Sequence, residues 1–289
     1  MLCELDNAIL AVDGGGTNCR FALETNGLRQ VVTLGAANVS TDFRRAVATL
    51  RDGLRLLAVN SGVPTDALAS LPAYLGLAGV VDEADAVRVR AALPLSNAEV
   101  SDDRSSAVRG ALGRANGSLA GLGTGSFFAR QNGGAIRLSG GWGSRLADEA
   151  SGFWIGRTAL VATLDTVDGF KPASDLTRAL MDQFGGPRGI VAFSISAAPT
   201  EVAALAPNVI AAAEAGDPAG SFVLKSGAEH ILKTLTAMGW QPGEPLCLIG
   251  GVSAAYRAHL PGIAPVPALG TALDGALALA RERAGPVPQ

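Results

Sequence analysis

The sequence has few cysteines, histidines and aromatic residues. Its three cysteines, Cys3, Cys19 and Cys247, show no CxxC spacing, so we expect neither a disulfide framework nor a zinc knuckle. The two histidines, His230 and His259, form no HxxxH pair, which argues against a zinc hydrolase. An odd number of cysteines without a pairing pattern is typical of a protein in a reducing compartment.

The sequence also lacks an extended basic block and a long apolar run. The formal net charge is −3, so we expect no nucleic-acid partner and no anionic membrane surface. No uncharged apolar run approaches the roughly 20 residues of a membrane span, and the first residues carry no basic signal region. These absences predict a soluble, cytoplasmic protein.

What the sequence has is glycine, alanine and an alternation of strand and helix patterns. Its 289 residues include 37 glycines, and the length allows one large domain or two lobes. The pattern predicts strands at 8–12, 19–23 and 31–34 and a helix capped by Ser40 or Thr41. The apolar steps of this helix run from Phe43 to Leu57. A strand at 74–78, a helix at 83–93 and a strand at 98–101 follow.

The opening pattern of strand, glycine turn and strand then recurs at 118–130, which indicates an internal duplication. We expect helices at 153–166, 175–184, 202–214, 221–238 and 270–283, a strand at 245–249, and a frayed tail at 285–289. The predicted fold is α/β, with two lobes and a ligand cleft between them. We assign residues 1–115 to the N-terminal lobe, with a helix at about 270–289 packing back on it, and 116–269 to the C-terminal lobe.

The first glycine turn follows a buried strand and joins Asp13 to Thr17. Without Cβ atoms, Gly14, Gly15 and Gly16 let backbone N–H groups approach phosphate oxygens. Asp13 could hold Mg²⁺, an ion that favours one or two carboxylates together with phosphates. An ordinary hairpin turn is the alternative interpretation of this segment.

A second turn of the same type contains Gly123, Thr124, Gly125 and Ser126. Neither turn is a Walker A loop, because no GxxxxGK[ST] motif occurs. The glycine pair at 250–251 follows a predicted strand and precedes a predicted helix. It offers a flat surface for a nucleoside, although such a pair alone is more often just a strand-to-helix turn.

Two further segments carry acidic residues. Asp102 and Asp103 end a predicted strand, where open α/β sheets place ligands. Asp103 is the better candidate for a base that accepts a hydroxyl proton, while Asp102 suits a helix N-cap. The second segment, 140–152, surrounds Trp142 with glycines and could bind a sugar; a core tryptophan is the alternative.

Together these motifs resemble the BadF/BadG/BcrA/BcrD branch of the sugar kinase, Hsp70 and actin superfamily, which includes N-acetylglucosamine and glucosamine kinases. The resemblance rests on AVDGGGTNCRFAL, LAGLGTGSFFAR, GGWGSRLADEASGFWIG and LIGGVS. It implies an actin-like, ribonuclease H-like ATPase fold. The chain departs from the family pattern at Ser144, where members often carry His, and at Ala147 and Ala150, where they often carry Gly.

The resemblance also implies roles for individual residues. It assigns Mg²⁺ to Asp13, terminal phosphates to Thr17 and Thr124, and the catalytic base to Asp103. Further sugar contacts are implied at Asn38, Ser126, Gly141, Trp142 and Asp148, and further nucleotide contacts at Gly14, Gly15, Gly16, Gly125, Gly216, Gly250 and Gly251.

The resulting hypothesis is an ATP- and Mg²⁺-dependent kinase that phosphorylates the 6-hydroxyl of N-acetylglucosamine or glucosamine. A homodimer is an expectation from the family. Two alternatives stay open at this point: an activator-type ATPase that drives a partner protein, and a sugar or nucleotide sensor without catalysis.

Overall fold

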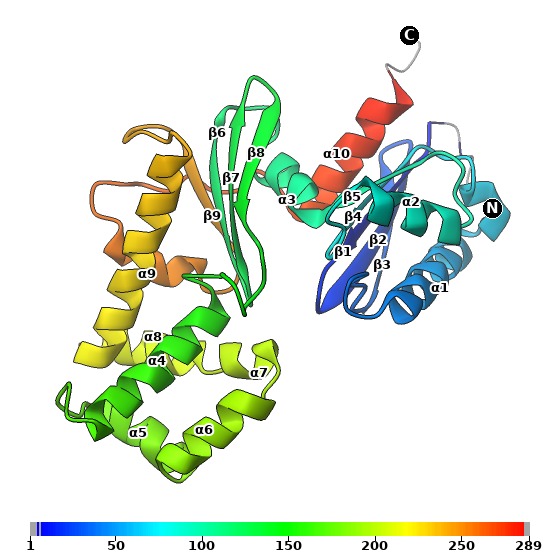
Figure 1. Ribbon diagram of the computed structural model, residues 1–289. Coiled ribbons are helices and arrows are strands. Elements are labelled where there is room, and N and C mark those ends of the chain that lie inside the picture. The colour runs from blue at the N-terminus through cyan, green and yellow to red at the C-terminus, as the bar shows by residue number, and fades with distance from the viewer. Residues whose placement is uncertain (1–4, 6, 286–289) are drawn as a thin grey trace. The chain divides into compact units, whose positions relative to one another are not determined.

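The computed structural model describes residue 5 and residues 7–285 (Figure 1). Cys3 and residues 286–289 of the tail expected at 285–289 lie outside the described residues. The chain forms two compact units. The first comprises the described residues up to Arg114 together with those from Ala268, and the second is Ala115–Pro267.

The first unit is built on a five-stranded sheet with the order β3-β2-β1-β4-β5. The strands are β1 (Ile9–Gly14), β2 (Asn18–Thr25), β3 (Leu28–Gly35), β4 (Ala73–Leu77) and β5 (Ala98–Asp102). The first three form an antiparallel meander, whereas β1, β4 and β5 are parallel. The carboxyl ends of these three strands therefore share one edge, which is where open α/β sheets bind ligands.

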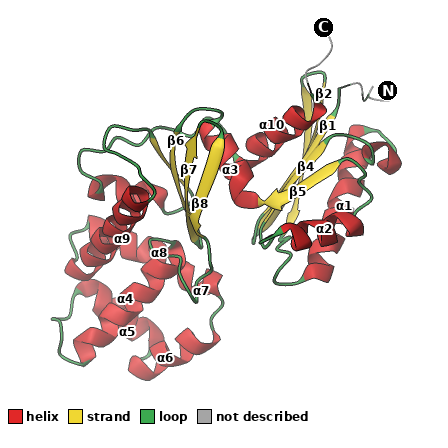
Figure 2. Ribbon diagram, turned by 45° about the horizontal axis from the view of Figure 1, so that its top comes forward, coloured by secondary structure: helices red, strands yellow, loops and turns green. Residues whose placement is uncertain are grey.

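Both faces of this sheet are covered by helices (Figure 2). On one face lie α1 (Phe43–Ser61), η1 (Thr65–Leu68) and α2 (Glu83–Ala92), and Leu50 and Leu54 of α1 enter the larger core. On the other face lies α10 (Ala272–Ala284), whose Leu277 packs in a smaller cluster with Tyr74. The α3 helix (Asp103–Leu112) packs along α10. The C-terminal helix thus completes the first unit.

The predicted start of α1 is wrong. Neither Ser40 nor Thr41 caps the helix; Asp42 does, and its Oδ1 accepts a hydrogen bond from the Arg45 N–H at 3.0 Å. The Ser40 hydroxyl instead donates to Asn38 Oδ1 at 2.9 Å. The chain forms a side-chain-stabilised turn before the helix, which delays the cap by one or two residues.

The second unit contains a four-stranded sheet with the order β8-β7-β6-β9. Its strands are β6 (Gly117–Leu122), β7 (Ser126–Asn132), β8 (Ala135–Gly140) and β9 (Leu246–Ile249). As in the first unit, an antiparallel meander is followed by a parallel strand beside its first member. The sequence predicted this repeat but missed β8, a short strand that has no fully buried residue.

Helices make up the rest of the second unit. They are α4 (Gly152–Val167), α5 (Asp175–Phe184), α6 (Pro187–Ser196), α7 (Pro199–Ala203), α8 (Ala206–Glu214), α9 (Pro218–Ala237) and the 3₁₀ segment η2 (Ser253–His259). The single helix predicted at 202–214 is wrong, because a proline in the first turn of α8 begins a new helix. The ordinary helix expected after Gly251 is also wrong, since η2 replaces it. No helix in the described part of the chain combines the length and the apolar character that a membrane crossing needs.

Candidate active site

The first glycine turn closes the β1–β2 hairpin. The Gly15 N–H donates to the Asn18 carbonyl at 2.9 Å, and the Gly15 carbonyl accepts from the Ala37 N–H at 3.1 Å. Gly16 and Thr17 are exposed, and within the described residues their N–H groups have no protein acceptor. The turn is therefore a hairpin whose tip presents open donors suitable for an anion.

Gly14 differs from its neighbours because it lies inside β1 and is buried. A Cβ added there would lie 2.6 Å from Leu77 Cδ2, so the glycine permits close packing of β1 against β4. Its expected phosphate contact stays a prediction, as does that of Gly15.

Asp13, the second-last residue of β1, is a buried carboxylate with one side-chain partner. Its Oδ2 accepts a hydrogen bond from Arg20 at 3.1 Å, while its Oδ1 has no partner among the described residues. Burial raises the pKa of Asp13, and the Arg20 hydrogen bond and charge oppose this shift. A carboxylate oxygen without a protein partner, on a residue that is itself buried and beside open N–H groups, fits a divalent cation that is shared with phosphate.

Asp103 lies directly after β5, at the first residue of α3. Burial, the Asp102 charge and the Asp13 charge raise its pKa to about 7, and the positive charge of Arg104 opposes them. A carboxyl group with that pKa is well suited to proton transfer near neutral pH.

Asp102 has the structural role that the sequence predicted. It is the N-cap of α3, and its Oδ1 accepts from the Arg104 N–H at 2.7 Å. The Arg104 guanidinium also binds it, through Nε to Oδ1 at 2.7 Å and through Nη2 to Oδ2 at 2.6 Å. Because both of its oxygens are held in this way, Asp102 is poorly placed to act as a base.

Asn38 follows the meander in a tight turn. Its Oδ1 accepts from the Ser40 N–H, the Ser40 hydroxyl and the Thr41 N–H at 2.9 to 3.1 Å. These bonds orient the amide so that its NH₂ group is the part available to a ligand. A Cβ on Gly79, which has φ +86°, would lie 2.5 Å from this oxygen. Only glycine leaves room for the turn.

In the second unit, the glycine turn between β6 and β7 is anchored to the start of α4. The Gly123 and Thr124 carbonyls accept from the Gly152 and Phe153 N–H groups at 2.8 and 3.1 Å. In the described part of the chain, the Thr124 and Gly125 N–H groups have no protein acceptor. This turn also presents open donors.

The loop from β8 to α4 wraps around this second turn. Asp148 is buried in a left-handed conformation with φ +71°. A Cβ on Gly125 would lie 2.8 Å from Asp148 Oδ2. Burial and the Glu149 charge raise the Asp148 pKa, while the nearby backbone N–H groups of Ser126 and Gly143 oppose that rise.

Ser126 forms hydrogen bonds to two residues of this loop, Glu149 and Gly141, whereas Trp142 is exposed to solvent. The Ser126 hydroxyl donates to the Glu149 carbonyl at 2.7 Å, and the Ser126 carbonyl accepts from the Gly141 N–H at 3.0 Å. Trp142 is 67% exposed. The alternative interpretation of Trp142 as a core residue is therefore wrong, and its ring is available to a ligand.

Ala150 explains one departure from the family pattern. It has φ +65° and is fully buried, so it adopts a conformation that glycine occupies without steric cost. The alanine keeps the backbone shape of a glycine position at a cost of about 1–2 kcal/mol of strain.

Three of the glycines expected to contact nucleotide, Gly216, Gly250 and Gly251, lie outside the two glycine turns. Gly250 has φ +98°, and a Cβ there would lie 2.3 Å from the Leu122 carbonyl, whereas Gly251 faces open space. Gly216 precedes the N-cap of α9. The η2 segment that follows Gly251 packs instead on the middle of α9, through Tyr256 against Gly227.

Sequence reasoning missed several neighbours of these residues. Arg20 faces Asp13 directly in the β1–β2 register, a signal that hairpin pairing could have given. No sequence pattern indicated that Arg104 would bind Asp102 or that Gly79 would lie against Asn38. His230, which the sequence set aside as a metal ligand, is half-buried. Its ring lies tilted against Phe128, with 5.8 Å between the ring centroids, and its Nε2 lies 3.8 Å from Glu149 Oε2.

With this geometry established, comparison with known proteins decides the family. Residues 10–260 match the BadF/BadG/BcrA/BcrD ATPase family. The chain belongs to this family. The family resemblance seen in the sequence motifs is thereby confirmed.

Individual relatives agree with this assignment. The chain is 28% identical to glucosamine kinase GspK of Vibrio cholerae over 251 residues, covering 86% of this chain and 85% of that protein. It is 30% identical to a proposed N-acetylglucosamine kinase of Chromobacterium violaceum, with a TM-score of 0.84 and coverage of 94% and 98%. A proposed N-acetylglucosamine kinase of Porphyromonas gingivalis shares the fold at 22% identity, TM-score 0.73 and coverage of 96% and 100%. The predicted α/β, actin-like fold with a repeated lobe is confirmed.

Proposed function

We propose that this BadF/BadG/BcrA/BcrD family member is an ATP-dependent kinase that transfers the γ-phosphoryl group to the 6-hydroxyl of an amino sugar, glucosamine or N-acetylglucosamine. The main support for this proposal is the position and pKa of Asp103. Its carboxyl group follows β5, has a pKa of about 7, and interacts with the charge of Asp13 next to the open glycine turn. The kinase names of the relatives support the same reaction.

In the proposed reaction, Asp103 orients the sugar hydroxyl and accepts its proton as the oxygen–phosphorus bond forms. ADP leaves with the electrons of the broken bond. Phosphoryl transfer depends mainly on positioning and on stabilising charge, and a base within hydrogen-bond reach contributes about 10²–10⁴-fold. Because the pKa of Asp103 lies near neutrality, the carboxylate is both available and basic enough at pH 7 to 8.

The open N–H groups of the two glycine turns bind phosphate oxygens of ATP in this scheme. Gly16 and Thr17 supply donors from the first unit, and Thr124 and Gly125 supply donors from the second. The hydroxyls of Thr17 and Thr124 add two further donors. Gly250 and Gly251 provide backbone without side chains for the nucleoside, and Gly216 is a further predicted contact.

Asp13 is the residue that would hold Mg²⁺, through its unpartnered Oδ1. The ion, when bound, neutralises charge on the β- and γ-phosphates. Arg20 keeps the second oxygen of Asp13 in a fixed orientation. Arg20 is therefore a positioning residue in this proposal.

The sugar would be bound by the Asn38 amide, the carboxylate of Asp148, and the exposed ring of Trp142 with the Gly141 backbone. Asp148 suits hydroxyl donors because its buried carboxylate lies beside the backbone N–H groups of Ser126 and Gly143. Ser126 holds this loop in place through Glu149.

The deciding experiment is a coupled ADP-release assay with Mg-ATP in the presence of glucosamine, N-acetylglucosamine, N-acetylmannosamine, glucose or no sugar, with product masses measured. We expect one amino sugar to stimulate ADP release strongly and to gain the mass of one phosphate. The Asp103→Asn protein should lose about 10²–10⁴-fold in rate. The matched control Asp52→Asn alters an exposed carboxylate on α1 and should retain the full rate.

ATP hydrolysis that no sugar stimulates would contradict the kinase and favour an activator-type ATPase. Binding of ATP and sugar without turnover would favour a sensor. Light scattering on the same sample would test the expected homodimer.

A further inference from the structure

The second unit carries an apolar hollow of about 440 Å³ that the proposed reaction does not use. It lies along α4, α6 and α7 and reaches the loop between β8 and α4. The volume lies within the range of pockets that enclose small organic ligands. Its walls are mainly aliphatic and include Leu160, Val161, Leu164, Ile190, Val191 and Val202.

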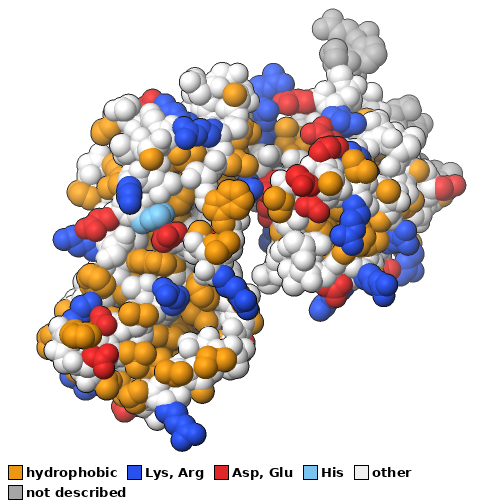
Figure 3. All heavy atoms as spheres, viewed as in Figure 1, with side chains coloured by type: hydrophobic (Ala, Val, Ile, Leu, Met, Phe, Trp, Pro, Cys, Tyr) orange, Lys and Arg blue, Asp and Glu red, His pale blue; other side chains and the backbone are white. Residues whose placement is uncertain are grey.

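Several of these wall residues remain exposed to solvent. The exposed fractions are 45% for Val161, 48% for Val191 and 80% for Ile195. Figure 3 shows hydrophobic side chains gathered over this helical part of the second unit. Contiguous exposed apolar surface of this kind usually marks a binding site.

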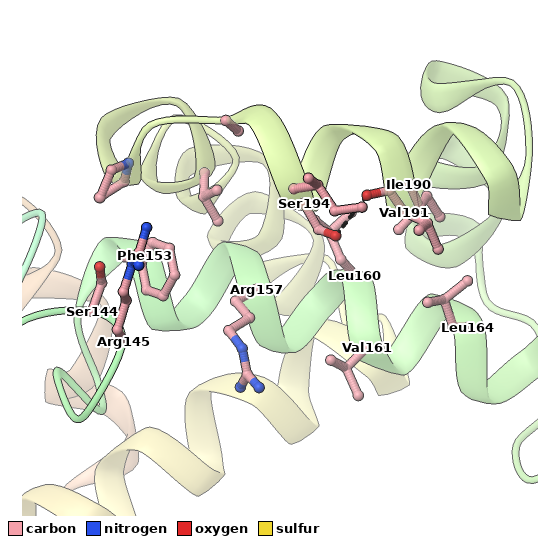
Figure 4. Close-up of a pocket in the computed structure, with 14 residues that line it drawn as sticks. Ser144, Arg145, Phe153, Arg157, Leu160, Val161, Leu164, Ile190, Val191 and Ser194 are labelled. Atoms are coloured by element: carbon pink, nitrogen blue, oxygen red, sulfur yellow. Dashed lines mark hydrogen bonds between the residues drawn. The ribbon is translucent and has the colours of Figure 1, made fainter.

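The hollow has a charged end and an apolar end (Figure 4). Arg145 and Phe153 lie at one end, and Leu164, Ile190 and Val191 lie at the other. Arg157 extends from the middle of α4, away from α6. Neither guanidinium has an ion pair or hydrogen bond to any described residue, whereas the Ser194 hydroxyl is already bonded to the Val191 carbonyl at 2.8 Å.

The Arg145 end continues into a second, more polar hollow. Arg145, Ser144, Phe153 and Arg157 line both hollows, and Glu149 lines the second. The charged end is therefore accessible, and an anionic group held there would keep contact with water. An unpaired arginine beside aliphatic walls is complementary to a molecule that has an acidic head and a hydrocarbon body.

We propose that this hollow is an effector site for an amphipathic organic anion, with a carboxylate or phosphate head at Arg145 and a hydrocarbon body between α4 and α6. A neutral molecule of the same shape would bury the same apolar surface but would leave the guanidinium unpaired. The site should therefore prefer the anion.

The position of Arg145 in the chain gives such a ligand a route to the sugar-binding residues. Arg145 lies in the loop between Trp142 and Asp148, and the Leu146 and Ala147 N–H groups both donate to the Gly143 carbonyl. Fixing Arg145 would therefore restrict the same short loop that presents Trp142. The expected effect is a changed KM for the sugar; this part rests on the proposed kinase function.

Binding can be measured without any catalysis. We would titrate the full chain with octanoate, octyl phosphate and octanol by isothermal calorimetry. Both anions should bind at least 10-fold more tightly than octanol, and their relative affinities would show which head group the site prefers. Arg145→Gln should reduce this preference to less than 3-fold.

A matched pair of variants on α4 locates the site. Val161→Glu places a carboxylate in the wall and should weaken octanoate binding at least 10-fold, with basal kinase activity unchanged. Val167→Glu alters a valine on the same helix that is 53% exposed and outside the hollow, and should leave octanoate binding within twofold.

The effector site would be overturned if no probe binds, if octanol and octanoate bind equally, or if the two glutamate variants have equal effects. A wild-type dimer that Val161→Glu converts to a monomer would show that a second copy covers this surface, and would also overturn it. Octanoate binding without a change in the sugar KM would remove the regulatory role. If octanoate binds as expected but no sugar stimulates ADP release, the site stands and the proposed kinase function fails.

Discussion

At Asp103, burial and two neighbouring carboxylates act in the same direction. Each disfavours the ionised form, and together they raise the pKa to about 7 against the opposing charge of Arg104. If Asp103 is the base, kcat/KM should rise with pH through about 7 and then level off, because the carboxylate must be ionised to accept the proton. A pH profile with no ionisation between pH 6 and 8 would contradict this assignment.

The same raised pKa predicts how Asp103→Asn affects stability. In the unfolded chain the carboxyl ionises near its usual pKa of 3.8, whereas in the folded protein it ionises at about 7. Between these values the folded protein binds the proton more tightly, so this group's contribution to stability falls as pH rises and is least favourable above about 7. The inactive Asp103→Asn protein should therefore melt above wild type at pH 8, and this difference should shrink toward pH 4.

Arg104 and Asp102 should shift that pH profile in opposite directions. Arg104→Gln removes the positive charge that pairs with Asp102, so the Asp103 pKa rises and the midpoint of kcat/KM moves to higher pH. Asp102→Asn keeps a good N-cap but removes the nearby negative charge, so the midpoint moves to lower pH. If the kcat/KM midpoint shifts in the same direction in both variants, Arg104 and Asp102 affect Asp103 through the local structure and not through their charges. Arg55→Gln, at an exposed position on α1, is the control and should leave the midpoint unchanged.

At the scale of elements, the α3–α10 contact depends on glycine. A Cβ on Gly110 would lie 1.9 Å from the Thr271 carbonyl oxygen, and a Cβ on Gly275 would lie 1.9 Å from the Ser106 carbonyl oxygen. Backbone atoms cannot yield as a side chain can, so Gly110→Ala should cost about 1–3 kcal/mol. Denaturant unfolding followed by circular dichroism would measure the loss. Gly35→Ala, with no atom near the added carbon, should change stability little.

Local signals predicted much of this fold. Helix α5 has the limits that the sequence pattern indicated, because Ser174 forms a capping box and Gly185 a left-handed cap, both of which are local features. The start of α1 was misplaced because Ser40 bonds to Asn38, a preference that competes with capping and depends on the turn around Gly79.

In the candidate site, too, some residues could be predicted from local sequence signals and others could not. The glycine turns and Asp103 follow strands, so their approximate places could be predicted from the order of the elements. The Arg104–Asp102 pair and the left-handed conformations of Asp148 and Ala150 could not, because they depend on the final packing of the loop and helix. The β8 strand was missed for a similar reason, since pairing with β7 stabilises a segment that has weak propensity of its own.

At the scale of the whole molecule, each unit has its own hydrophobic core. The three tryptophans, Trp142, Trp154 and Trp240, all belong to the second unit, and Trp240 is buried in its core. Tryptophan fluorescence therefore reports on the second unit, while hydrogen exchange at β1 amides reports on the first. The two probes together can show whether the units unfold separately.

Leu277→Ala makes this test specific. Leu277 is fully buried in α10 and packs against the β1 face of the first unit, so its truncation should cost that unit about 2–5 kcal/mol. We expect faster exchange at β1 amides with little change in the fluorescence midpoint. The matched variant Ile231→Ala, in the core of the second unit, should lower the fluorescence midpoint and leave β1 exchange nearly unchanged. If either variant moves both probes equally, the two cores unfold as one cooperative body, and the C-terminal helix stabilises the whole chain and not the first unit alone.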